Sequence, residues 1–416
     1  MVTRRFPDEP SEAASEPTPP SAPSQGQNVA RIGRPPAPTQ PPVPQSPPLD
    51  PHNPSQHPAR VSRRALTHRP SQHMPRTLAQ VLNDANDSVV RGDLSDFTPQ
   101  PTGFDPLDGL IGGGLRKTEL VLLGGAQGIG KTIAALQMAR NIAMRPDQFA
   151  FYISYEHTET HLMNRLLCLE SVNPPEIDTR NGLKLKDLFD IIISQRAREL
   201  LGRDTTKSGS LQTILREHPK TSMALARLNK YADRLIMVKA SPAVTTLSAI
   251  REMTARLAEA TSGNLTVFVD YLQKVAIYPE RAENEEDKVT IVVEGLKDIA
   301  LSLNIPVLSI VAADREGLKA KRLHLFHLRG SSALDYECDI AIIMNNKYQV
   351  LAKDHISFNP YAAQQFRNWV VFTVEKNRAG RAMMDMEFQL HAPFFAFDPR
   401  GQEVRQQLID DKIIES

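Results

Sequence analysis

The stretch GGAQGIGKT, residues 124–132, decides the fold of this chain. An apolar segment at 119–125, ELVLLGG, precedes it, and a segment with apolar residues at helical spacing, KTIAALQMARNIAM at 131–144, follows it. Five residues of the stretch fit the pattern G-x-x-x-x-G-K-[ST]: Gly125, Gly128, Gly130, Lys131 and Thr132. A strand, a glycine-rich loop and a helix in this order form the context that distinguishes a P-loop from a chance glycine-rich turn.

The residue types of this loop point to a phosphate ligand. Glycines let backbone N–H groups face phosphate oxygens, and the N-terminus of the following helix favours negative charge. We expect Lys131 to reach the β- and γ-phosphates of ATP and the Thr132 hydroxyl to ligate Mg²⁺. ATP and Mg²⁺ are therefore the predicted ligands.

From about residue 103 the chain alternates between strand and helix patterns. The apolar strand candidates are 119–125, 149–156, 234–240, 265–272, 305–313, 339–346 and 368–377. Helical patterns lie between several of them, at 131–144, 160–170, 246–260 and 286–304. Nearly continuous apolar strands separated by helices predict an α/β fold with a mostly parallel sheet covered on both faces.

Two carboxylates stand at the ends of predicted strands. Asp270 ends the apolar run LTVFVD, where a buried carboxylate is costly unless a cation such as Mg²⁺ neutralises it. Glu156 ends the strand after the P-loop helix and is the predicted group that orients an attacking water. Because the carboxyl ends of parallel strands line the ligand crevice, both should face the phosphates. The alternatives are an ordinary strand-end Asp and a solvated Glu, but a second carboxylate favours hydrolysis over simple nucleotide binding.

The composition divides the chain into segments. Of its 32 prolines, 19 precede Leu78, so residues 1–75 are predicted to be a disordered Pro-rich tail, whose polyproline segments suit a protein partner. Residues 76–102 are predicted to hold a linker helix, with a capping-box pair at Thr77 and Gln80, and a loop. Residues 103–400 are the predicted ATPase domain, with a helical excursion of unassigned function at 171–232, and 401–416 form a C-terminal tail.

Charge and cysteine usage exclude some classes of protein. The formal net charge is +1, so a nucleic-acid surface has to be a local patch. The two cysteines, Cys168 and Cys338, are predicted core residues of a reduced, cytoplasmic protein. No apolar run of about 18 residues is present, so we expect no transmembrane helix. A signal or transit peptide is disfavoured, because no apolar region follows the basic start and acidic residues are frequent there.

Several segments outside the P-loop carry a family resemblance. In chain order they are PTGFDPLDGLIGGGL, ISYEHTETHLMNRLL, VDYLQ, EGLKDIALSLNIPVLSI, LRGSSALDYECDIAI and VEKNRAG. In order and spacing they resemble the ATPase domain of DnaB-type replicative DNA helicases, within the RecA-like P-loop ATPases, over residues 76–400.

The resemblance implies a ring, a hexamer in this family, that encircles single-stranded DNA and hydrolyses ATP between subunits. Lys376 and Arg378 in VEKNRAG match the pair that reaches the neighbour's γ-phosphate, and the alternative is a surface basic pair. The DNA-facing loop matches LRGSS, which makes Arg329, Gly330 and Ser332 candidate DNA contacts rather than an ordinary polar loop. The linker helix would dock on the adjacent subunit, whereas its apolar stripe alone also allows docking on its own domain.

The chain departs from the family pattern in three places. No segment of this sequence resembles the family's N-terminal collar domain that meets primase, so we do not expect a primase interaction by the usual route. Ala312 stands where the family has a glutamine that couples the γ-phosphate to the DNA loops, so coupling is expected to be weakened or rerouted through Asp314 or Arg315. The excursion at 171–232 is longer than its counterpart.

Three functions remain in competition. The first is a ring-forming DNA helicase that translocates on single-stranded DNA, and we favour it. The second is a RadA- or KaiC-like ATPase of recombination, repair or regulation, because GGGL and GIGKT resemble those relatives equally well. The third is a nucleotide-gated scaffold that recruits partners through its tail.

Overall fold

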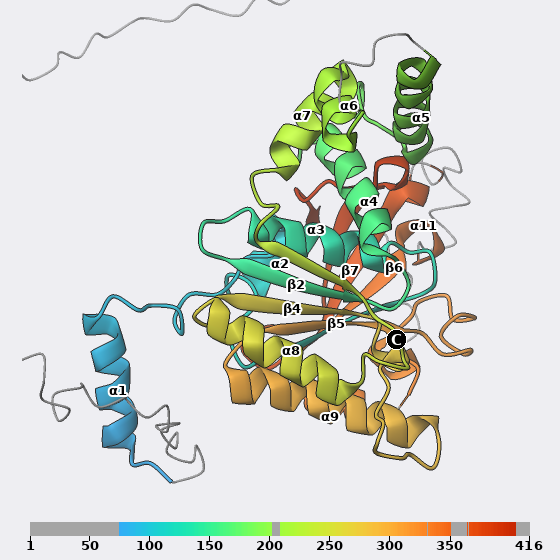
Figure 1. Ribbon diagram of the computed structural model, residues 1–416. Coiled ribbons are helices and arrows are strands. Elements are labelled where there is room, and N and C mark those ends of the chain that lie inside the picture. The colour runs from blue at the N-terminus through green and yellow to red at the C-terminus, as the bar shows by residue number, and fades with distance from the viewer. Residues whose placement is uncertain (1–74, 202–208, 331, 351–363, 365, 405–416) are drawn as a thin grey trace, which may run out of the picture. The chain divides into compact units, whose positions relative to one another are not determined.

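The computed structural model describes residues 75–201, 209–330, 332–350, 364 and 366–404 (Figure 1). Nearly all of them belong to one compact unit, Arg76–Ser416. The predicted tail at 1–75, apart from Pro75, lies outside the described residues, as do 405–416 of the predicted C-terminal tail and 202–208 of the helical excursion.

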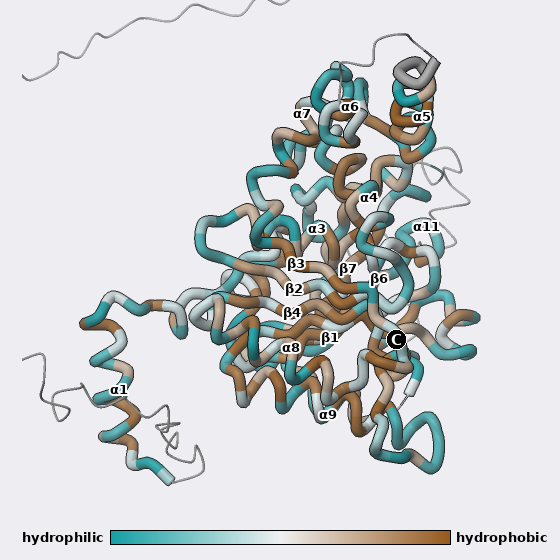
Figure 2. The backbone as a smooth tube through the Cα atoms, in the orientation of Figure 1, coloured by the Kyte–Doolittle hydropathy of each residue, from teal (hydrophilic) through white to brown (hydrophobic). Residues whose placement is uncertain are grey.

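The centre of this unit is a parallel sheet with the strand order β6-β1-β5-β4-β2-β3. Its strands are β1 (Leu120–Gly125), β2 (Phe149–Ser154), β3 (Leu235–Lys239), β4 (Leu265–Asp270), β5 (Val307–Ala312) and β6 (Ile340–Asn346). Each coincides with a predicted strand. Both faces of the sheet are buried: Val121 and Leu123 belong to one core cluster, while Leu120 and Leu122 belong to the other. Figure 2 shows these strands as the hydrophobic centre of the domain.

Helices cover both faces of this sheet (Figure 1). Apolar residues of α3 (Lys131–Ala143) and α4 (Glu159–Ser171) pack in one core cluster, and those of α8 (Leu247–Ala260) and α9 (Glu285–Leu303) pack in the other. The two layers explain why the strands are apolar throughout instead of alternating. The α/β fold with a sheet flanked by helices is as predicted.

An antiparallel extension continues the sheet beyond β6. It consists of β7 (Trp369–Asn377), β8 (Met384–His391), β9 (Ala396–Phe397) and β10 (Gln402–Glu403). Of these four, the sequence predicted only β7. The segment MDMEFQLH of β8 alternates between apolar and polar residues, so it lacks the continuous apolar run that marked the central strands. The complete sheet is therefore mixed.

The remaining helices lie outside the two main layers or are short. α1 (Leu78–Val90) begins at a capping box formed by Thr77 and Gln80 and has no buried residue. The excursion contains α5 (Leu185–Leu201), α6 (Leu211–Glu217) and α7 (Pro219–Leu228), which share a small core with α4. Short elements are α2 (Asp105–Leu110), α10 (Ala333–Glu337), α11 (Lys347–Val350) and the 3₁₀ turns η1 (Leu272–Lys274), η2 (Leu325–His327), η3 (Phe366–Asn368) and η4 (Ala392–Phe394).

Two further sequence expectations concern the described residues. Cys168 and Cys338 are both free and buried. Within the described ranges, no helix combines the length and the apolar character needed to cross a membrane.

Candidate nucleotide site

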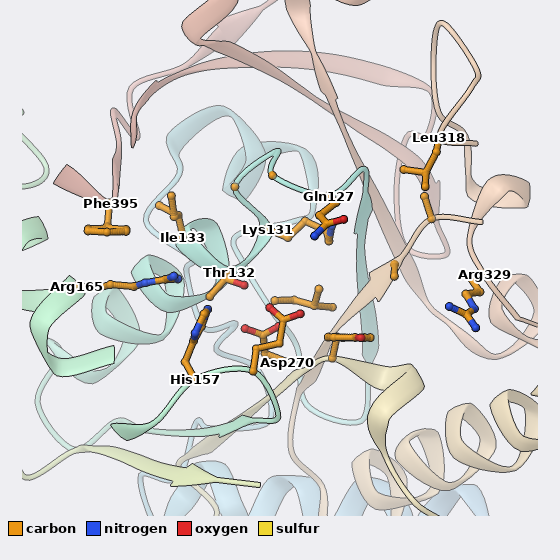
Figure 3. Close-up of a pocket in the computed structure, with 17 residues that line it drawn as sticks. Gln127, Lys131, Thr132, Ile133, His157, Arg165, Asp270, Leu318, Arg329 and Phe395 are labelled. Carbon is orange, nitrogen blue, oxygen red and sulfur yellow. The ribbon is translucent and has the colours of Figure 1, made fainter. Parts of the chain in front are cut away.

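The strand register brings the predicted site residues to one edge of the sheet. Ser154 pairs with Asp270 and Gly125 pairs with Ala312, so the carboxyl ends of four parallel strands lie together. A cavity of about 480 Å³ opens there, lined by the P-loop, by Glu156 after β2, by Asp270 and by the end of β5 (Figure 3). This is the place where open α/β sheets bind ligands.

The P-loop conformation depends on its glycines. Gly125 has φ +155°, and a Cβ atom there would lie 2.8 Å from the Met344 carbonyl oxygen. Gly130 caps the N-terminus of α3 with φ +101°. Neither backbone conformation suits a residue with a side chain, so both positions require glycine. The loop and the helix N-terminus together form a site suited to anions.

Lys131 lies inside the cavity beside the loop backbone. Its Nζ donates to the carbonyl oxygens of Gly125 and Ala126, each at 2.8 Å. Burial lowers the pKa of Lys131 to about 8, although Asp270 and Glu156 both act in the opposite direction. A nearby phosphate would favour the charged amine further, because it brings negative charge to a partly desolvated group.

Asp270 is a buried carboxylate beside two hydroxyl groups. It is 1% exposed, and the Tyr152 hydroxyl donates to its Oδ2 at 2.9 Å. Burial raises the pKa of Asp270 to about 6, while hydrogen bonds from Tyr152 and Thr132 lower it. A hydroxyl and a carboxylate at the edge of a cavity are oxygen donors of the kind Mg²⁺ prefers. A divalent cation would also offset the cost of ionising this carboxylate, so these residues fit the metal.

Glu156 lies in the same cavity but in a different environment. It follows β2 by two residues, is exposed, and lines the cavity together with Lys131 and Asp270. An exposed carboxylate facing a phosphate site has access to water, which the buried Asp270 does not. The structure therefore brings together Lys131 and Thr132 from the start of α3 with Glu156 and Asp270 from two strand ends.

The sequence reasoning missed several residues that line this cavity, among them His157, Arg165 and Phe395. Arg165 projects from α4, and its guanidinium carbon lies 5.0 Å from the centre of the Phe395 ring (Figure 3). The pKa of His157 is lowered to about 4, mainly by burial and further by the charges of Arg165 and His161. His157 is therefore neutral at physiological pH. The only sequence signal was a lone arginine inside the apolar stretch of α4.

Comparison with known proteins adds to this geometry. A family model described as the DnaB-like helicase C terminal domain matches residues 100–398. The chain belongs to this family. It is similar to the replicative DNA helicase DnaC of Bacillus subtilis, 26% identical over 252 residues that cover 60% of this chain and 47% of the relative. The replicative DNA helicase DnaB of Geobacillus stearothermophilus is 24% identical over 283 residues, covering 67% and 54% respectively.

A solved structure agrees with the fold of this DnaB-like domain. It is a DnaB-like replicative helicase studied with its primase interactions, with a TM-score of 0.54 and 19% identity, and the match covers 78% of this chain and 67% of that chain. At this identity the likeness supports the RecA-like fold alone. The chain spans about half the length of the two helicases named above.

In this DnaB-like domain, Lys376 lies in β7 and Arg378 directly after it, both away from the P-loop edge of the sheet. β7 runs antiparallel to β6, and Lys376 of β7 pairs with Ala341 of β6. Ala341 pairs with Leu122 of β1 on its other side. Leu122 precedes Gly125 by three residues, so Lys376 lies roughly 10 Å short of the P-loop edge along the strands and roughly 10 Å across them. Neither Lys376 nor Arg378 lines the cavity of its own chain.

The local contacts of this basic pair are with α10 and its surroundings. Lys376 donates to the carbonyl oxygen of Asp335, and Arg378 donates to that of Tyr336. Arg378 also lies 3.6 Å from the Asp339 carboxylate, with half of its side chain exposed. The pair is thus held at the surface.

The loop predicted to face DNA adjoins the cavity. Arg329 lines it from the side opposite Arg165 (Figure 3), and its guanidinium is paired with Glu285 at 2.7 Å. Gly330 has φ +138° and packs closely on Val289 of α9. Ser332 is exposed at the start of α10.

Coupling through Asp314 or Arg315 stays a prediction. Ala312 ends β5 and lines the cavity, but neither of these two residues does. The Asp314 carboxylate accepts a hydrogen bond from the Gly317 backbone at 2.6 Å and so closes its own turn.

Proposed function

We propose that this chain assembles into a hexameric ring that hydrolyses ATP, with Mg²⁺, at the interfaces between copies while it moves along single-stranded DNA. Membership of the DnaB-like family and the names of the relatives support this function. The nucleotide cavity supplies the chemistry that such a motor needs.

The cavity residues divide the work of hydrolysis. The P-loop amides and Lys131 hold the β- and γ-phosphates. Mg²⁺ held by Thr132 and Asp270 would neutralise charge on the phosphate oxygens. Glu156, the exposed carboxylate, orients the attacking water and accepts its proton.

The position of Lys376 and Arg378 is the observation that carries the proposal. Neither side chain lines the cavity of its own chain, so on this proposal the pair acts on the phosphates of a neighbouring copy. An arginine supplied in this way stabilises charge on the transferring phosphoryl group and contributes about 10³–10⁵ in rate. On this proposal, a second copy of the chain completes the ATPase site.

Two other surfaces suit the same assembly. The α1 stripe is exposed, with Leu78 83% and Leu82 66% accessible, and we assign it to docking on the adjacent copy. Arg329, Gly330 and Ser332 would contact the DNA backbone, a sequence-independent mode that suits translocation. A protein partner for the Pro-rich tail stays a prediction.

A mixing experiment tests the site between subunits. Lys131→Ala removes the phosphate contact and Arg378→Ala removes the group supplied to the neighbour, so each variant alone should be inactive. Random co-assembly in equal amounts gives intact sites at about a quarter of the interfaces, because each interface uses one residue from each copy. ATP turnover should reappear in the mixture, and a mixture as inactive as its components would refute the proposal.

A RadA- or KaiC-like ATPase is the alternative, and Ala312 is the feature that favours it. The family match favours the helicase instead. A forked duplex with one labelled strand separates the two functions: ATP-dependent strand separation supports the helicase, whereas DNA-stimulated ATP turnover without separation supports the alternative.

A further inference from the structure

Gln273 lies where the nucleotide cavity meets the loop around Arg329. It belongs to the 3₁₀ turn η1, three residues after Asp270, and it is 9% exposed. A buried amide in this place needs partners for both of its polar atoms, because an unsatisfied one is costly.

The side-chain amide of Gln273 bridges two other segments. Its Oε1 accepts from the Ala312 backbone N–H at 3.2 Å, and its Nε2 donates to the Arg329 carbonyl oxygen at 2.7 Å. The Arg329 N–H in turn donates to the Ala312 carbonyl oxygen at 2.8 Å. If the amide were flipped, its Nε2 would face the Ala312 N–H and its Oε1 would face the Arg329 carbonyl oxygen. These partners therefore determine its orientation.

The three residues joined by these hydrogen bonds each lie beside a functional element. Ala312 and Arg329 both line the nucleotide cavity. Gln273 follows Asp270 within one short turn, and Lys288 of α9 donates to its backbone oxygen at 2.9 Å. A displacement of the Asp270 end of β4 therefore has to move the amide or break its bonds to Ala312 and Arg329.

We propose that Gln273 is a positioning residue that couples occupancy of the nucleotide site to the conformation of the loop at 328–330. The inference rests on the proposed function, because the ligand of that loop is taken to be single-stranded DNA. At position 312 the methyl side chain cannot form a hydrogen bond, and the amide of Gln273 supplies a side-chain link to the same backbone position. Coupling between two ligands is reciprocal, so DNA on the loop also changes the nucleotide site.

Two substitutions break the link in different ways. Gln273→Glu keeps an acceptor for the Ala312 N–H but places a second carboxylate oxygen against the Arg329 carbonyl. Gln273→Met keeps the approximate volume and removes both bonds. The matched control is Gln137→Glu, because Gln137 bridges the backbone of Phe397 in the same manner, at 2.8 and 2.9 Å, and joins α3 to β9 instead.

The experiment compares ATP turnover with and without a single-stranded oligonucleotide, after thermal unfolding has shown that each variant is folded. It also compares oligonucleotide affinity in a non-hydrolysable ATP analogue with that in ADP. We expect both ratios to fall about fivefold or more in the Gln273 variants and to persist in Gln137→Glu, since coupling typically spans about 5–150-fold. A merely structural role would lower stability without moving these ratios.

The outcomes separate the inference from the function on which it rests. A DNA-stimulated wild-type chain whose Gln273 variants are stimulated equally would overturn the inference alone. A wild-type chain that does not respond to DNA would overturn the proposed function and the inference together.

Discussion

Asp270→Asn should stabilise the ligand-free protein while it abolishes Mg²⁺-dependent ATP turnover. The Asp270 carboxyl is 1% exposed, and burial raises its pKa from 3.8 to about 6. A shift of about two units corresponds to about 3 kcal/mol, at about 1.4 kcal/mol per unit. This is the free energy that the folded state loses when the buried carboxyl ionises without a cation. Asparagine keeps an oxygen for the Tyr152 hydroxyl and carries no charge.

The sign of the pH dependence follows from the raised pKa. Between pH 4 and pH 6 the folded protein binds more protons at Asp270 than the unfolded chain does, so the stability contribution of this group falls as pH rises through about 6. The asparagine side chain of the Asp270→Asn variant does not titrate. The stability difference between variant and wild type should therefore grow by about 2 kcal/mol from pH 4 to pH 7. Titrations by other groups occur in both proteins and cancel.

Urea unfolding at fixed protein concentration, in the presence of EDTA, measures this difference. Glu156→Gln is the matched control for activity, because it removes an exposed carboxylate from the same cavity and should lower turnover. Added Mg²⁺ should stabilise the wild type and not Asp270→Asn, with an affinity that falls about tenfold per pH unit below 6 as protons compete. A stability difference that stays constant from pH 4 to pH 7 would refute the reasoning.

Three other substitutions give separate tests. Glu285→Gln should free Arg329 from its half-exposed ion pair and tighten oligonucleotide binding about two- to fivefold, and anisotropy titrations showing weaker binding would contradict this. In the wild type, buried Arg140 donates to the Glu170 carboxylate at 2.6 and 2.9 Å. Glu170→Gln should lower the free energy of unfolding by about 3–5 kcal/mol, because it leaves the Arg140 charge buried without a counter-charge. A loss under about 1 kcal/mol in urea titrations would argue against this. Gly330→Ala should reduce DNA stimulation of ATP turnover, since φ is +138° and the added Cβ meets α9 at 2.5 Å, and unchanged stimulation would show that the loop conformation does not matter.

The sequence was sufficient for the central sheet and for one side of the site. The parallel strands each carry an apolar run, and the P-loop pattern lies between one of them and an amphipathic helix. Once the strands are parallel, their carboxyl ends share an edge, so residues far apart in sequence, such as Glu156 and Asp270, have to meet there. Strand β8 was not predicted, because its apolar residues alternate with polar ones.

The tertiary structure decided what the remaining residues face. The apolar pattern of β7 is compatible with either direction, and only its antiparallel pairing with β6 places Lys376 and Arg378 at the edge away from the P-loop. In the sequence, Arg165 is only one polar residue of a predicted helix. The packing of α4 beside the cavity places its side chain in the lining. The bridge from Gln273 to Ala312 and Arg329 joins three segments whose proximity no local pattern encodes. Local periodicity and motif spacing determined the P-loop and the strands because short-range sterics and burial act along the chain, whereas strand direction and side-chain bridges arise from contacts between distant segments.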